Sequence, residues 1–317
     1  MACMEVWGGN QTVNSAVVMA GLDAWVFSRP YQNADGGGDV YYVSSCATGR
    51  INRLLLADVS GHGAGVAEIA RDLRTMMRKF INYIDQTKFV LSMNSHFTEA
   101  TEDSIFATAI VTTFFAPTNT LTLCNAGHPP PLLYRSAIKQ WMYLDGRGDG
   151  EAIRNVPLGI FECEYEQFEV RLGVGDLVLC YSDCLPEARY TSGEMLGQAG
   201  LLELIRSLDV QNPATLFPAL IDAVGRMNPQ NLDADDLTTL LFRPNGLAPN
   251  APMKDRLLGP FRVLGSLARS VFDRSVPASW PELSIANIGG AIFPALGRWQ
   301  RRRKNSLKPP VNTDKHV

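Results

Sequence analysis

The sequence lacks the patterns that mark membrane-spanning, secreted and zinc-binding chains. No segment approaches the roughly 18 consecutive apolar residues that a membrane-spanning helix requires. The 6 cysteines show no CxxC spacing and no zinc-knuckle pattern, which argues against a structural zinc site. The first residues, Met1–Glu5, carry no basic region followed by an apolar core, so we expect no signal peptide. We therefore expect reduced thiols and a cytoplasmic location.

What the sequence does contain is the composition of an ordinary folded protein. Its 317 residues are 46% hydrophobic and 19% charged, enough apolar material for one large domain or two small ones. The net charge of −3 conceals two unlike parts. Residues 246–317 carry 12 Lys/Arg and 4 Asp/Glu, whereas residues 1–245 carry 17 and 28. We therefore expect a folded domain over 1–245 and a Pro-rich, basic C-terminal extension over 246–317.

Two interpretations of the basic extension are open. Residues 285–299 are apolar, and the run Arg301-Arg302-Arg303-Lys304 follows, as in an interfacial anchor for anionic lipid. The alternative, which we favour, is a tail helix packed on the domain with a solvated basic end. Peripheral contact with a membrane surface is thus the open alternative to a purely cytoplasmic protein, and no nucleic-acid partner is indicated.

Residue patterns over 1–245 predict an α+β fold. Residues 1–20 are weakly patterned, but β-branched and aromatic runs predict about ten strands further on, mostly joined as hairpins. These strands cover 22–28, 40–46, 51–58, 105–115, 120–125, 132–135, 140–144, 167–172, 177–183 and 237–243. Apolar residues at helical spacing predict a helix of about six turns from residue 63, and further helices at 88–100, 197–208 and 213–226. Hairpin blocks separated by helix blocks indicate antiparallel sheets covered by helices.

Acidic residues stand at the ends of several predicted strands. Asp39, Asp58 and Asp183 do so, and the pair Asp235-Asp236 precedes the last strand. Aspartate is disfavoured in strands and common in turns, so any one of them alone indicates only turn chemistry. Four such positions beside long apolar strands instead favour a shared oxygen-ligand site for Mg²⁺ or Mn²⁺. A pair of such ions can activate a water molecule and neutralise a phosphoryl group under attack.

These acids belong to short motifs whose order and spacing resemble those of the PPM-type, protein phosphatase 2C-like Ser/Thr phosphatases. The likeness is to the bacterial, SpoIIE-like branch of sporulation and general-stress phosphatases, and it covers roughly residues 20–245. The motifs are Gly37–Tyr41 (GGDVY), Ala57–Gly63 (ADVSGHG), Asn125–Pro130 (NAGHPP), Pro157–Gly159 (PLG), Tyr181–Asp183 with Glu187-Ala188, and Asp235–Thr238 (DDLT). The resemblance implies a four-layer αββα sandwich, in which two antiparallel sheets lie face to face with helices outside.

The resemblance also implies a site for two Mn²⁺ or Mg²⁺ ions. The implied catalytic and metal-binding groups are Asp39, Asp58, Asp183 and Asp235, the carbonyl of Val59, and Asp236 as the alternative to Asp235. Asp58 would bridge both ions, while Val59 and Asp39 would serve one of them and Asp183 and Asp235 the other. Because Val59 would act through its carbonyl, its side chain would be free to vary.

The implied reaction is hydrolysis of phosphoserine or phosphothreonine in a protein, by direct attack of a metal-bound hydroxide and without a phosphoenzyme. In the bacterial branch the usual substrate is a phosphorylated anti-sigma factor antagonist of a partner-switching system. A non-catalytic binding module with the same fold is the alternative. Two departures from the family pattern, Tyr42 for an acid and Cys184 for a glycine, would weaken activity or metal binding.

Other reactive side chains are expected to have structural roles. His62 is expected to shape its turn in preference to acting as a general acid, and His128 to fix a loop. Cys180 and Cys184, which flank Asp183, are expected to be structural thiols. Glu187 is expected to support the Asp183 loop.

Overall fold

The computed structural model describes residues 3–46, 48–61, 63–83, 85–101, 105–145 and 155–247. The strands are β1 (Cys3–Gly9), β2 (Val13–Met19), β3 (Leu22–Arg29), β4 (Asp39–Cys46), β5 (Ile51–Val59), β6 (Ala107–Phe115), β7 (Thr120–Ala126), β8 (Leu132–Arg135), β9 (Gln140–Tyr143), β10 (Phe168–Arg171), β11 (Leu177–Tyr181) and β12 (Leu237–Pro244). The α-helices are α1 (Ala64–Phe80), α2 (Gln86–Ala100), α3 (Cys184–Glu187), α4 (Gly197–Arg206) and α5 (Pro213–Met227). Short 3-10 helices occur at Tyr31–Asn33, Ala116–Thr118 and Pro229–Asp233.

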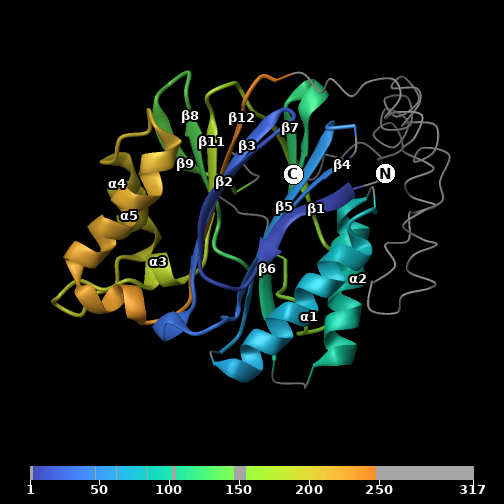
Figure 1. Cartoon of the computed structure of the whole chain (residues 1–317), viewed down its shortest axis with the longest axis horizontal. Coiled ribbons are helices and arrows are strands. Elements are labelled where there is room, and N and C mark those ends of the chain that lie inside the picture. The colour runs from blue at the N-terminus through green and yellow to red at the C-terminus, as the bar shows by residue number, and fades with distance from the viewer. Residues whose placement is uncertain are drawn as a thin grey trace, which may run out of the picture.

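Two antiparallel, six-stranded sheets lie between two layers of helices (Figure 1). One sheet has the order β1-β4-β5-β6-β7-β10 and is covered by α1 and α2; the other has the order β2-β3-β12-β11-β8-β9 and is covered by α3, α4 and α5. Three buried clusters fill the spaces between helices and first sheet, between the two sheets, and between second sheet and helices. The predicted αββα sandwich is therefore confirmed.

Side-chain alternation explains why the sequences of the central strands are continuous runs of apolar residues. In β4, Tyr42 packs in the cluster under α1 while Tyr41 packs between the sheets. In β5, Leu55 faces the helices and Leu56 faces the other sheet. Successive residues of a strand point to opposite faces, so a strand buried on both faces must be apolar at nearly every position.

The two strands that the sequence did not predict, β1 and β2, are edge strands of the two sheets. β1 ends in Gly8-Gly9, and most of β2 is exposed, so neither shows the alternation of a half-buried strand. Edge positions tolerate such sequences because only one side of the strand is paired. The predicted hairpins at 40–58 and 105–125 are confirmed as β4–β5 and β6–β7.

The first helix is shorter than predicted, since α1 ends at Phe80. Its end is fixed by Arg53 of β5, a completely buried side chain that donates hydrogen bonds to the carbonyls of Ile81 and Tyr83. The last carbonyls of a helix lack partners within the helix, so a buried guanidinium can terminate it there. Sequence periodicity carries no information on such a tertiary contact.

Several predictions concern parts of the chain outside the described ranges. His62 and nearly all of the basic extension lie there, so membrane contact through residues 301–304 stays a prediction. Across the described ranges no helix has both the length and the apolar character needed to cross a membrane.

Candidate metal centre

The paired acids Asp39 and Asp58 form the base of the site. They are direct cross-strand partners in the β4–β5 ladder, and opposed side chains in such a ladder have Cβ atoms about 4.5–5.5 Å apart. Asp39 lies two residues before Tyr41, and Asp58 two residues after Leu56, so both carboxylates share the face that looks toward the second sheet. Like charges at opposed positions destabilise a sheet, so this pair needs a compensating charge.

Asp39 is the least satisfied acid in the described part of the protein. It is only 2% exposed, and neither carboxylate oxygen makes a hydrogen bond of normal geometry, although the hydroxyls of Ser182 and Thr238 act on it as donors. Burial raises the pKa of Asp39 well above its usual range, and the charges of Asp58 and Asp236 raise it further. The hydroxyls of Ser182 and Thr238 lower it only in part. A buried carboxylate of this kind is costly unless a cation or donor satisfies it.

Acids from the second sheet extend the cluster. Asp183 follows β11, and Asp235 precedes β12, which is the hydrogen-bonded neighbour of β11. Burial raises the pKa of Asp58 to about 8, with further contributions from Asp183, Asp235, Asp236 and Glu187. Burial, Glu187 and Asp235 together raise the pKa of Asp183 to about 6. The two sheets thus bring the predicted carboxylates into one electrostatic cluster at the edge of the sandwich.

The carbonyl of Val59 lies at the same place. A Cβ atom built on Gly38 would lie 2.9 Å from the Val59 oxygen and 3.4 Å from Oδ2 of Asp236, so these groups surround Gly38. The Val59 side chain, in contrast, is fully buried in the cluster beneath α1. The prediction that this side chain is free to vary is therefore wrong, because strand alternation places it in the core.

Asp236 and Asp235 have different surroundings. The two oxygens of Asp236 accept hydrogen bonds from the backbone N–H groups of Tyr31 and Gly38, each 2.6 Å long. These bonds tie the loop that leads into β4 to the start of β12. Asp235 accepts a hydrogen bond from the backbone N–H of Asp236, and its charge acts on Asp58 and Asp183.

The donors available to a cation are all oxygens. Carboxylates and a backbone carbonyl suit Mg²⁺ or Mn²⁺, and no basic group is among the largest causes of the pKa shifts of Asp39, Asp58 and Asp183. Among the described residues, no three His, Cys, Asp or Glu side chains are spaced to hold a single ion as they stand. The fit of the site to a divalent cation therefore rests on the sheet topology, on the burial of Asp39 and on its two unsatisfied oxygens. It does not rest on coordination distances.

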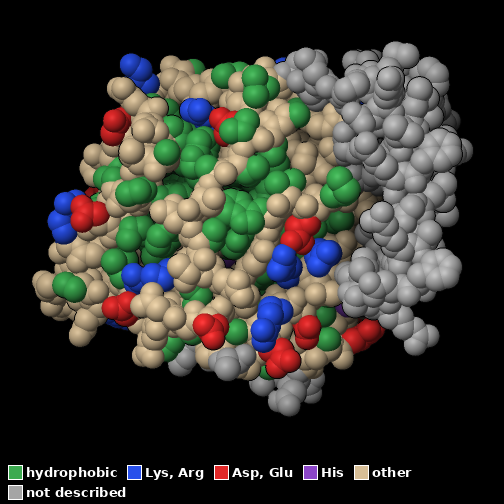
Figure 2. Space-filling view, viewed as in Figure 1, with side chains coloured by type: hydrophobic (Ala, Val, Ile, Leu, Met, Phe, Trp, Pro, Cys, Tyr) green, Lys and Arg blue, Asp and Glu red, His purple; other side chains and the backbone are tan. Residues whose placement is uncertain are grey.

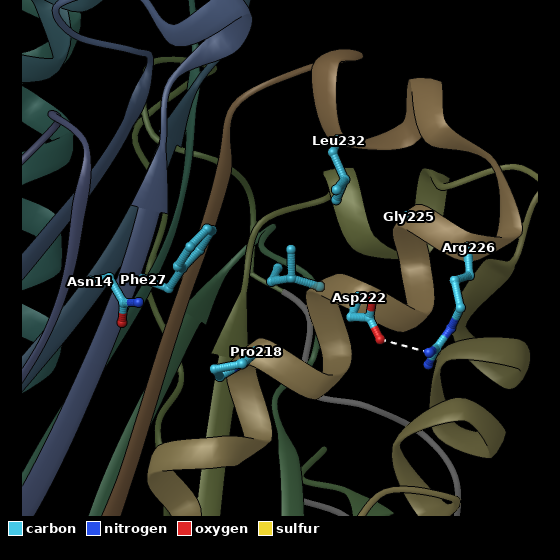
Figure 3. Close-up of a pocket in the computed structure, with 8 residues that line it drawn as sticks. Asn14, Phe27, Pro218, Asp222, Gly225, Arg226 and Leu232 are labelled. Atoms are coloured by element: carbon cyan, nitrogen blue, oxygen red, sulfur yellow. Dashed lines mark ion pairs between the residues drawn. The ribbon is translucent and has the colours of Figure 1, made fainter.

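A hollow with apolar walls lies elsewhere in the described residues. It is a groove of about 460 Å³ between the outer face of β2–β3 and α5, with apolar walls that include Phe27 and Pro218 (Figure 3). Figure 2 shows hydrophobic side chains gathered in this area. Its one acid, Asp222, pairs with Arg226 at 2.7 Å. The groove therefore lacks the unpaired charge that distinguishes the carboxylate cluster.

The residues that are predicted to have structural roles are mostly buried. His128 is buried, and its backbone N–H and carbonyl exchange hydrogen bonds with the side chain of Asn125, which fixes the loop. Its ring Nδ1 lies 2.8 Å from Oγ1 of Thr108, and burial lowers the pKa of the ring to about 3. Cys180 and Cys184 are buried in core clusters. Tyr42 points toward α1, on the opposite face of β4 from Asp39.

One residue that sequence reasoning missed is Asn10, in the β1–β2 connection. Its side-chain amide donates hydrogen bonds to the backbone carbonyls of Gly37 and Ala67, both 2.9 Å long. Its backbone carbonyl accepts a hydrogen bond from the backbone N–H of Gly37. Asn10 thus joins the loop before Asp39 to α1. No signal in the weakly patterned stretch 1–20 could have identified it.

We expect Gly37→Ala to disturb the centre. A Cβ atom at this position would lie 2.5 Å from Cγ of Asp236, so the carboxylate or the loop must move. Denaturant unfolding should show a loss of about 1–3 kcal/mol, and calorimetry should show weakened Mn²⁺ binding. Gly65→Ala is the matched control, because its Cβ meets nothing within 4 Å and alanine favours a helix. Equal behaviour of the two variants would contradict the prediction.

Comparisons with known proteins identify relatives of this chain. The chain is 24% identical over 224 residues to phosphoserine phosphatase RsbU of Bacillus subtilis (strain 168), an overlap of 70% of this chain and 63% of RsbU. The chain therefore spans less than two thirds of that relative.

Solved structures with the same fold are also found. The RsbU and RsbW domains of Rv1364c from Mycobacterium tuberculosis match with a TM-score of 0.61 and 23% identity, over 84% of this chain and 73% of that one. The PP2C phosphatase domain of SpoIIE from Bacillus subtilis, with a fragment of its regulatory domain, matches with a TM-score of 0.59 and 20% identity, over 73% and 64%. The catalytic domain of the serine/threonine phosphatase PstP, solved with 2 manganese ions, matches with a TM-score of 0.50 and 18% identity, over 70% and 97%.

At these identities the structures establish a shared fold. The family assignment comes from the sequence, since the model of the stage II sporulation protein E (SpoIIE) family matches residues 49–245. That match covers more than half of the chain and includes Asp58, Asp183 and Asp235. The chain belongs to the SpoIIE family of PPM-type, protein phosphatase 2C-like proteins.

Proposed function

We propose that this protein is a Mn²⁺- or Mg²⁺-dependent phosphatase that hydrolyses phosphoserine or phosphothreonine in a partner protein. The observation that carries the proposal is the orphaned carboxylate of Asp39, buried directly opposite Asp58. A buried acid directly opposite a half-buried one is stabilised by a cation, and the charges of acids from the second sheet also act on Asp58. Membership of the SpoIIE family and the likeness to a phosphoserine phosphatase support the choice of reaction.

Each residue has a defined part in this proposal. Asp58, which interacts with acids from both sheets, would bridge two ions. Asp39 and the Val59 carbonyl would hold one ion, and Asp183 and Asp235 the other. When bound, two divalent cations lower the pKa of a water molecule and neutralise the phosphoryl group under attack.

The protein's own contribution is to hold these oxygens in place in a partly buried site. The β4–β5 ladder fixes Asp39 against Asp58, and the hydrogen bonds to Asp236 fix the approach of the loop into β4. Electrostatic attraction is stronger in such surroundings than in bulk water.

The proposed substrate is a phosphorylated regulator of a partner-switching system, such as an anti-sigma factor antagonist. Support comes from the similarity to RsbU and to the RsbU and RsbW domains that occur together in Rv1364c. A cytoplasmic location would suit such a partner. The match leaves part of RsbU uncovered, and the proposal concerns only the reaction and the substrate.

Phosphate release from p-nitrophenyl phosphate and from a phosphoserine peptide tests this function. We expect turnover with Mn²⁺ and none after chelation with EDTA. Inactivity of the wild type over a range of metals would reject the enzyme, and isothermal calorimetry would then decide the alternative. Failure to bind Mn²⁺ near millimolar concentration would favour a non-catalytic binding module.

A further inference from the structure

A second, polar hollow lies beside the carboxylate cluster. It has a volume of about 330 Å³ and lies between the β1–β2 connection and α1, where its walls include Trp7, Asn10, Tyr41, Arg71 and Arg74. Figure 2 shows charged side chains gathered along α1 in this area. Tyr41 follows Asp39 by two residues on β4, which is about 7 Å along the strand.

Asn10, which lines this hollow, also contacts the loop that leads into the carboxylate cluster. The buried side chain of Asn10 bonds to Gly37 on one side and to Ala67 of α1 on the other. Gly37 is also the glycine whose Cβ position is occupied by Asp236. A ligand in the hollow would therefore lie against the same loop that leads into Asp39.

The hollow carries excess positive charge. Among the described residues, its lining includes Arg71 and Arg74 and no acidic residue, and Glu5, the ion-pair partner of Arg74, is shared with Arg78. Nε of Arg74 is buried and has no acceptor. Arg71 is exposed and forms no ion pair within the described ranges. Two guanidinium groups, of Arg71 and Arg74, therefore lie beside the site that is proposed to bind a phosphoryl group.

Its shape suits a short acidic side chain with an aliphatic stem. Trp7 and Tyr41 pack edge to face at 5.5 Å and form the apolar wall. Gly8 leaves room for Arg74 at the strand edge, because a Cβ there would lie 3.2 Å from Nε of Arg74. Guanidinium groups bind carboxylates through parallel N–H···O hydrogen bonds, which adds geometric selectivity to charge attraction.

We propose that this hollow binds a glutamate or aspartate side chain of the phosphoprotein substrate. The inference rests on the proposed function, because it assumes that the phosphoryl group occupies the carboxylate cluster. An extended chain advances about 3.3 Å per residue, so the acid lies about two to four residues from the phosphorylated serine or threonine. Arg71 is then a specificity-determining residue that binds the substrate away from the reacting bond.

Paired phosphopeptides test this proposal. Each pair carries glutamate or glutamine at one position, two to four residues before or after phosphoserine, and is assayed with wild type, Arg71→Ala, Arg71→Lys and Arg226→Ala. We expect the wild type to show a KM lower by roughly three- to tenfold for the glutamate peptide at one of these positions. Arg71→Ala should remove that difference without changing kcat or turnover of p-nitrophenyl phosphate. Arg71→Lys should keep part of it.

Arg226→Ala is the matched control, since Arg226 is an exposed helical arginine beside the apolar groove of Figure 3. It should retain the full preference, and added salt should weaken the preference in the wild type. The proposal is overturned if the wild type shows no glutamate preference at any of these positions, or if the preference survives in Arg71→Ala.

Turnover of p-nitrophenyl phosphate separates this inference from the proposed function. If the wild type fails to hydrolyse it, the proposed function fails, and the same labelled peptides are then compared by fluorescence anisotropy. A glutamate preference in binding that Arg71→Ala removes would still support an acid-binding hollow. Equal binding of the two peptides would overturn it.

Discussion

Asp58→Asn should abolish metal-dependent phosphatase activity and yet make the metal-free protein more stable. Loss of the carboxylate that is proposed to bridge the ions should lower kcat/KM by at least about 10³-fold, because the charge stabilisation that the cations would provide is worth several kcal/mol. The gain in stability follows from the surroundings of Asp58. Its ionised carboxylate is partly buried, directly opposite Asp39 and close to other acids, with no basic group among the causes of its pKa shift.

The stability gain should depend on pH in a defined direction. The pKa of Asp58 is about 8 in the folded protein, above its ordinary value of 3.8. Between these two values the folded state binds more protons than the unfolded state, so the stability of the wild type falls as pH rises. Asparagine does not ionise, so the advantage of the variant in EDTA should grow from pH 5 to pH 8. We expect roughly 1–3 kcal/mol at pH 8, after allowance for partial exposure.

Asp176→Asn provides the opposite case. Burial alone would raise the pKa of Asp176, but hydrogen bonds from Gly173, Ser136 and Arg135 lower it below its usual range. This carboxylate is satisfied, so its replacement should destabilise the protein by about 1–3 kcal/mol at pH 8. Urea unfolding in EDTA measures both variants. A loss of stability in Asp58→Asn at pH 8 would show that Asp58 has a compensating partner, contrary to the prediction.

The sequence allowed the first half of the site to be predicted because that half is local. Asp39 and Asp58 lie at equal distances from the turn near Gly49, so a simple hairpin places them opposite each other. Strand alternation then places both on the face that carries Tyr41 and Leu56. The motif resemblance supplied the acids of the second sheet, whose contact with the first sheet has no signature in local periodicity.

The parts of the site that escaped prediction depend on contacts between distant segments. Asn10 comes from a weakly patterned stretch whose strands lie at sheet edges, and its partners are Gly37 and Ala67. Arg71 lies on the polar face of α1, and its place in the hollow depends on the packing of α1 beside the β1–β2 connection. Residue spacing predicts which face of an element is buried, but it does not predict which loop will cover that face.

We expect the adjacent acids Asp235 and Asp236 to have different roles, metal binding for Asp235 and a structural role for Asp236. We expect Asp236→Ala to lose about 2–4 kcal/mol of stability, because two backbone N–H groups, of Tyr31 and Gly38, lose a charged acceptor in a buried place. Activity should fall as well, since the loop before Asp39 is released. Asp235→Ala should lose activity to a similar extent and stay within about 1 kcal/mol of the wild type in EDTA.

Urea unfolding in EDTA and Mn²⁺ calorimetry measure the two roles independently. Added Mn²⁺ should raise the unfolding midpoint of the wild type, because a ligand that binds only the folded state stabilises it. Asp235→Ala should lose most of this shift while its midpoint in EDTA is kept, whereas Asp236→Ala should have a lowered midpoint before any metal is added. If Asp235→Ala is the unstable variant and Asp236→Ala binds Mn²⁺ less well with unchanged stability, the two roles are reversed. In that event the hydrogen bonds of Asp236 to the loop would have to give way when the ion binds.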